Sequence, residues 1–127
     1  MPRTNSGRDW QCGVMADPAS SGAGAYAPAT WMVLSTDTTA ENPTRTTLPG
    51  ELTGGTMARA QGAYAHTSGT ASYTLIKTFV SDRDVAVRKF GVFTAASGGT
   101  LVWEKLLDET VNLKSGDSMQ IVQTVSI

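Results

Sequence analysis

Any nucleophilic chemistry in this chain would have to be arranged around His66, its single histidine. A Ser–His or Cys–His mechanism needs a nucleophile within hydrogen-bond reach of the imidazole, and the candidates are the one cysteine, Cys12, and several serines. The sequence contains no GxSxG or HExxH motif, and its cysteine is far from the histidine. The pattern therefore favours a structural histidine at the end of a strand, and acyl transfer is not expected.

Asp82 and Asp84 flank Arg83 in a short polar segment and could offer carboxylate oxygens to calcium. Calcium takes about six to eight oxygen ligands, so other loops would have to supply more acids. A turn held by local hydrogen bonds is the simpler interpretation. The remaining candidates for such a calcium shell are Asp37, Glu41 and Asp117.

The sequence supports other cofactors and reactions no better than calcium binding or acyl transfer. A single cysteine excludes an internal disulfide and leaves too few Cys and His ligands for a zinc site. Gly54-Gly55 and Gly98-Gly99 lack the Lys-Ser/Thr of a P-loop and are interpreted as turn glycines. The 11 acidic residues reveal no pair facing a cleft, as glycosidase carboxylates do. We expect no cofactor and no enzymatic activity.

The composition argues against some classes of partner. Ten basic against 11 acidic residues give a net charge of −1, so nucleic acid and anionic membranes are not expected as partners. The sequence has no run of 18 apolar residues, and its first ten residues lack the apolar core of a signal peptide. We expect the product to accumulate in the cytoplasm of the cell that makes it.

The chain divides into two predicted parts. Residues 1–29 are expected to form an irregular N-terminal arm and a linker rich in Ala, Gly, Ser and Pro, with at most a short helical or extended piece over 6–15. Residues 30–127 are expected to form a β-sandwich domain. Its predicted strands are 31–34, a weak one within 57–66, 71–80, 85–93, 100–107 and 118–127, with a long loop over 36–56 and an irregular link after 107.

The region from Val85 to Ile127 carries the clearest strand patterns. Its last strand alternates, with Met119, Ile121 and Val125 on one face. In the strand 71–80 both faces carry apolar residues, so we expect the second face to be covered as well. The fold class predicted is all-β: an antiparallel β-sandwich with a jelly-roll or immunoglobulin-like topology and an irregular N-terminal arm.

The aromatic residues separate into core and surface candidates. Trp31 and Trp103 lie in predicted strands and are expected in the core, whereas Trp10 lies in the arm and suits a core or an interface equally. If the arm holds a neighbouring subunit, the residues expected to touch it are Arg8, Asp9, Trp10, Val14 and Met15.

Three segments together resemble small structural proteins of tailed bacteriophages. These are the opening Asn5-Ser-Gly-Arg-Asp-Trp10, the hairpin Gly91-Val-Phe-Thr-Ala-Ala-Ser-Gly-Gly-Thr100 and the final strand begun by Gly116-Asp-Ser118. The similarity covers about half the chain and leaves out residues 16–56. It implies a β-rich virion protein without catalytic residues, most like a capsid decoration or minor capsid protein.

This resemblance and the predicted arm lead to one expected function and two alternatives. We expect a trimeric decoration (cement) protein on the capsid exterior, bound to the major capsid protein through the arm and stabilising the head. The first alternative is a tail or fibre component, which exposed Tyr and Trp on loops 36–56 or 94–99 would favour. The second is a small glycan hydrolase, which would need His66 and two acids in one pocket.

Overall fold

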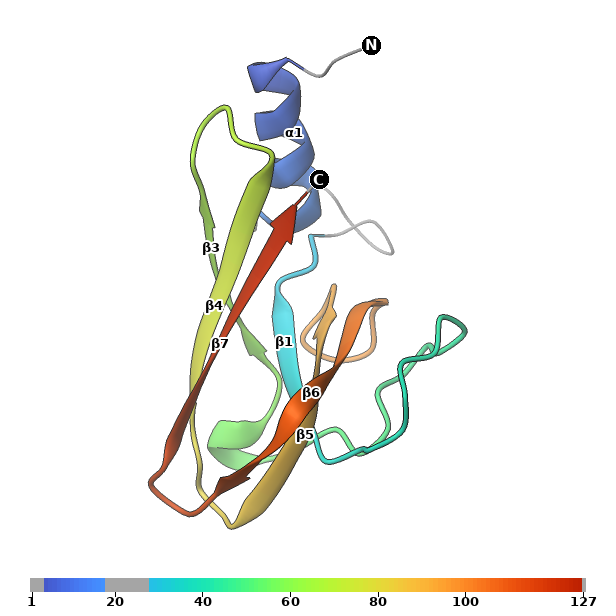
Figure 1. Ribbon diagram of the computed structural model, residues 1–127, viewed down its shortest axis with the longest axis vertical. Coiled ribbons are helices and arrows are strands. Elements are labelled where there is room, and N and C mark those ends of the chain that lie inside the picture. The colour runs from blue at the N-terminus through green and yellow to red at the C-terminus, as the bar shows by residue number, and fades with distance from the viewer. Residues whose placement is uncertain (1–3, 18–27, 127) are drawn as a thin grey trace.

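The computed structural model describes residues 4–17 and 28–126, which form two antiparallel β-sheets with a helix at one end (Figure 1). One sheet has the order β2-β1-β5-β6 and the other the order β3-β4-β7. The predicted all-β sandwich is confirmed. The elements are α1 (Asn5–Ala16), β1 (Trp31–Ser35), a 3-10 turn η2 (Gly55–Met57), β2 (Ala60–Gln61), β3 (Ala63–His66), β4 (Ser72–Val80), β5 (Val85–Phe93), β6 (Leu101–Leu113) and β7 (Ser118–Ser126).

The core lies between the two sheets and is built by alternation along the strands. In β4 the side chains of Tyr73, Leu75 and Phe79 are all buried, as the period of two predicts. They meet residues of the other sheet such as Met32 and Val87 in one apolar cluster. Burial of these large side chains is the main force that holds the sheets together.

The predicted weak strand over 57–66 is divided between the two sheets. β2 pairs with β1, and β3 pairs with β4. Gly62 is the residue between them, and a Cβ there would lie 2.8 Å from the sulfur of Met32. A larger residue there would displace the buried Met32 side chain, so glycine suits the point where the chain passes from one sheet to the other close to the core.

Over Asn5–Ala16 the arm is not irregular: of the short helical or extended piece predicted over 6–15, the structure has the helical form, and it is the longer helix α1. Thr4 caps its first turn, since its hydroxyl accepts a hydrogen bond from the Gly7 N–H at 3.0 Å. The inner face of the helix is anchored by Cys12 and Ala16, both fully buried in the main core cluster. The predicted linker falls mostly on residues 18–27, outside the described ranges.

The predicted irregular link after residue 107 was also wrong, because β6 continues to Leu113. Val87 of β5 pairs with Val111 and Lys89 with Leu106, so four residues of β6 lie opposite one residue of β5. This bulge breaks the regular alternation, which explains why the sequence pattern suggested an interruption.

Among the described residues, the expectation that the second face of β4 is covered is met only in part, since Thr74 and Ile76 are half-buried. Val80 of β4 is 50% exposed, and Val122 of the neighbouring strand β7 is 54% exposed. Both side chains alternate with buried neighbours and therefore lie on the outer face of the sheet β3-β4-β7. This face of the sandwich meets solvent. Among the described residues, the only α-helix is too short to cross a membrane.

Candidate interaction surface

The helix α1 is fixed to the sandwich by a carboxylate that binds the turn between β3 and β4. Asp9 Oδ1 accepts hydrogen bonds from the Gly69 N–H at 2.7 Å and from His66 Nε2 at 2.8 Å. Asp9 Oδ2 accepts a third hydrogen bond from the Ser68 hydroxyl at 3.0 Å. The guanidinium of Arg8 adds a longer contact, 3.4 Å, to the Gly69 carbonyl. Helix and turn are therefore held as one body.

The surroundings of His66 favour its protonated form. Nε2 faces the carboxylate of Asp9, and Nδ1 lies 2.8 Å from the carbonyl oxygen of Ser72. Both neighbours are acceptors, so both ring nitrogens must carry a proton to donate to them. The hydrogen bond to Asp9 raises the pKa of His66, helped by the one to Ser72. In turn the Gly69 amide, followed by His66, lowers the pKa of Asp9.

The opposite face of α1 exposes apolar side chains to solvent. Trp10 is 70% exposed, and Val14, one turn further along the helix, is 38% exposed. Residues four apart lie on the same side of a helix, so these two side chains form one patch, called here the α1 patch. Helix α1 stands at one end of the molecule, beside β3 and β4 (Figure 1).

The five predicted partner-contact residues therefore divide into two groups. Trp10 and Val14 face solvent, as a contact with a neighbour requires. Arg8 and Asp9 bind the β3–β4 turn within the chain, and Met15 packs against the core. The three inward residues orient the helix that presents the other two.

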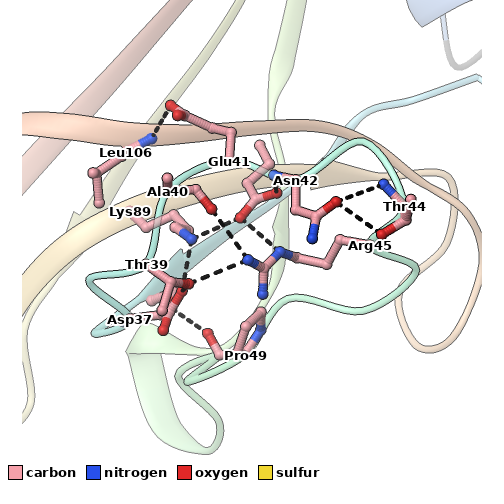
Figure 2. A network of polar contacts seen from close by, with 12 residues as sticks. Asp37, Thr39, Ala40, Glu41, Asn42, Thr44, Arg45, Pro49, Lys89 and Leu106 are labelled. Carbon is pink, nitrogen blue, oxygen red and sulfur yellow. Dashed lines mark hydrogen bonds and ion pairs between the residues drawn. The ribbon is translucent and has the colours of Figure 1, made fainter.

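A second group of charged side chains surrounds the fully buried Lys89 of β5 (Figure 2). From the sequence only one of its members, Asp37, was named, and as a possible calcium ligand. The ammonium group of Lys89 donates to Asp37 Oδ2 and to Glu104 Oε1, both at 2.6 Å. Arg45 Nε forms a further ion pair with Glu104 at 3.0 Å. We call Asp37, Arg45, Lys89 and Glu104 the loop-binding cluster, because it ties the loop after β1 to the sheet.

The two cations and the two carboxylates of the loop-binding cluster neutralise one another, so the cluster does not have the electrostatics of an acid–base pair. The hydrogen bond from Lys89, followed by one from Thr39, lowers the pKa of Asp37 to about 2. Burial alone would lower the pKa of Lys89, but the two carboxylates outweigh it and the pKa is raised. Glu41 of the same loop is also engaged, since its carboxylate accepts from the Leu106 N–H at 2.8 Å. These charges hold the loop in place.

The other predicted chemical candidates have structural roles where the structure shows a partner. Asp82 accepts a local hydrogen bond from its neighbour Arg83 at 2.7 Å, as the predicted turn requires, and a long-range one from the Thr56 N–H at 3.2 Å. Within residues 4–17 and 28–126, His, Cys, Asp and Glu nowhere gather in a group able to hold a metal ion. Cys12 is buried in the core, and His66 forms a pair with Asp9 of the helix instead of meeting a nucleophile.

Fold and surface together define an all-β sandwich that presents an apolar patch on a docked N-terminal helix. Comparison with known protein families, curated proteins and solved structures found no match to this chain.

Proposed function

We propose that the chain is a non-enzymatic structural protein of a tailed bacteriophage virion, a decoration protein that binds the major capsid protein through the α1 patch. The observation that carries the proposal is the exposure of Trp10, at 70%, on a helix whose other face is fixed by hydrogen bonds and core packing. Exposed tryptophan on a rigid support is typical of the residues that dominate protein–protein binding. The resemblance of the N-terminal segment, the 91–100 hairpin and the last strand to phage structural proteins supplies the virion context.

The ordered helix supports this role better than a flexible arm would. A disordered arm loses conformational entropy when it binds, whereas a docked helix has already lost most of it on folding. The hydrogen bonds of Asp9 to the β3–β4 turn fix the direction in which Trp10 points. The helix is thus prepared to enter a preformed apolar recess on a neighbouring subunit.

The size of the contribution can be worked from the exposed area. A Trp side chain buries roughly 150–250 Å² when fully covered. With 70% of this surface available, about 100–175 Å² can be removed from water. At about 25 cal/mol per Å² this corresponds to about 2.5–4.4 kcal/mol, an upper bound for binding by this side chain.

The test is binding of the purified protein to heads of the encoding phage that lack it, measured by co-sedimentation. Trp10→Ala should weaken binding at least about 30-fold, the equivalent of about 2 kcal/mol. Val102→Ala is the control, because Val102 is also an exposed apolar residue, at 41%, and lies on strand β6 away from the α1 patch. A substitution is preferable to deletion of residues 1–15, which would open the core at Cys12. Undiminished binding of Trp10→Ala would refute the proposal.

The copy number in purified virions separates this role from that of a tail or fibre component. A decoration protein should be present in hundreds of copies, and a fibre or tail-tip protein in a few to tens of copies. Neither loop 36–56 nor loop 94–99 contains the Tyr or Trp that a glycan-binding fibre surface would use. Quantitative mass spectrometry of virions measures the number directly.

A further inference from the structure

The two sheets end in four edge strands, and three of these are protected against pairing with another chain. β2 is only two residues long, and β3 has four residues and is contacted by α1. β6 is long, but it contains a bulge and four charged residues. Its middle is also covered by the loop after β1, since the Leu106 N–H donates to Glu41. Short length, bulges, charges and cover are the usual means by which proteins protect sheet edges.

β7 has none of these protections. It runs for nine residues, and all nine pair in unbroken register with β4, so it has no bulge. The sequence Ser-Met-Gln-Ile-Val-Gln-Thr-Val-Ser contains no charged residue and no proline. Among the described strands β7 pairs with β4 alone, which leaves its other edge with outward-facing N–H and C=O groups.

We propose that this free edge of β7 pairs antiparallel with β7 of a second copy of the chain, which gives a dimer in place of the trimer expected from the sequence. The joined sheet would have the order β3-β4-β7-β7′-β4′-β3′, with a two-fold axis between the two β7 strands. Val122 is the central residue of β7, so this axis places it opposite Val122 of the other copy. Gln120 then faces Thr124 of the other copy, and Met119 faces Val125.

The strand is complementary to itself, which favours a second copy over a different partner. An uncharged strand brings no like charges together when it meets its own copy, and it offers no charge by which a foreign protein would be selected. In this register every residue of β7 also stays on its own face of the sheet. Val122, now 54% exposed, would lie against its counterpart at the axis.

The side of the sandwich next to β7 has room for this neighbour. An open groove of mixed character, about 530 Å³, lies between β6 and β7. Its lining combines Leu107, Val111, Met119 and Ile121 with the polar Asp108, Glu109 and Gln120. The inward-facing side chains of the second β7 would lie alongside this opening. The pairing therefore adds apolar contacts to the backbone hydrogen bonds between the strands.

The association state of the purified full-length chain tests the inference. Light scattering after size-exclusion chromatography, over a range of concentrations, should give a dimer for the wild type. Val122→Lys places two ammonium groups opposite each other and should raise the dimer dissociation constant at least about tenfold. Val102→Lys, an equal change at an exposed valine of β6, should leave it unchanged. The dimer should persist at high salt, because the pairing strands carry no charge.

A cysteine at the axis tests the register. Val122→Cys should form a disulfide between two copies on mild oxidation, because residues directly opposite in antiparallel strands bring their Cβ atoms to about 4.5–5.5 Å. Val102→Cys should not form one, and the native Cys12 is buried. A monomeric or trimeric wild type, or a dimer unaffected by Val122→Lys, would overturn the inference. Loss of capsid binding by Trp10→Ala is a separate result, because Trp10 lies on α1 and takes no part in this pairing.

Discussion

Replacing Lys89 by Met should destabilise the fold by about 2–4 kcal/mol, because it removes the central cation of the loop-binding cluster. Breaking a buried ion pair on one side costs about 3–5 kcal/mol, since the remaining charge stays buried without its partner. Two features reduce this cost here. Glu104 keeps its ion pair with Arg45, and Asp37 lies on a loop from which its carboxylate can turn toward water. Methionine fills the volume of the lysine stem, so no large cavity is expected.

Urea unfolding followed by circular dichroism, at one fixed protein concentration, measures the difference. Lys105→Met is the control, because Lys105 is an exposed lysine of β6 and its removal should change the stability by no more than about 0.5 kcal/mol. The dependence of stability on acid pH provides a second measurement. The pKa of Asp37 is lowered to about 2 from an ordinary 3.8, so its stabilising effect is present above 3.8 and lost as the pH falls toward 2. Lys89→Met should lessen this acid-dependent loss. A change below about 1 kcal/mol in urea would refute the assignment of the cluster as the support of the loop.

Two further predictions concern the β3–β4 turn and the 91–100 hairpin. The pKa of His66 is raised, so its stabilising effect is complete below pH 6.5 and is lost as the pH rises through the folded-state pKa. Because the hydrogen bond to Asp9 raises this pKa, Asp9→Asn should lower it in an NMR titration. Asp108→Asn on β6 should leave it unchanged. Gly98 and Gly99 both have positive φ, but only at Gly99 would a Cβ meet neighbouring atoms, at 2.9 Å. Gly98→Ala should lower the free energy of unfolding by roughly 1 kcal/mol, and Gly99→Ala by more. Equal melting temperatures for these two variants would contradict that explanation.

The strands could be predicted from the sequence because apolar and polar residues alternate along a half-buried strand. In β4 and β7 apolar residues recur at alternate positions, interrupted once in each strand by Lys77 and Gln123, and the structure buries most of that set. The bulge in β6 could not be predicted, because four residues there lie opposite a single residue of β5 and the period is lost.

The helix α1 was predicted only as a short piece, helical or extended, for a different reason. Two glycines, Gly7 and Gly13, weaken its intrinsic helix propensity, and its first turn contains no acidic residue. What stabilises it is mostly tertiary: Asp9 binds residues 66–69, almost 60 positions away, and Cys12 enters the core. A local pattern does not contain such contacts.

Lys89 is a case in which a signal was present in the sequence. It stands at an inward position between Val87 and Gly91 of a strand that was predicted at 85–93, and a buried lysine there must find carboxylates. Its partners could not be identified from the sequence, because Asp37 comes from an irregular loop and Glu104 from the next strand. Inward charges in predicted strands are therefore a useful sign of buried ion pairs.

The two proposed surfaces lie on different parts of the same sheet, so they should reinforce each other. In the order β3-β4-β7, the helix contacts β3 and β4, whereas the pairing edge is the outer side of β7. A β7–β7′ dimer therefore leaves both α1 patches uncovered and can bind two capsid subunits at once. Bivalent attachment can raise the apparent affinity by about 10²–10⁴ without a new contact.

Val122→Lys should consequently weaken attachment to capsids by about 100-fold or more, even though Val122 would touch no capsid subunit. The measurement is co-sedimentation at concentrations where the wild type is dimeric, with Val102→Lys as the matched control. Well above the dimer dissociation constant of the variant, the difference should disappear, because mass action restores the dimer. If Val122→Lys abolishes the dimer but leaves capsid attachment unchanged, each copy binds alone and the two surfaces are not coupled.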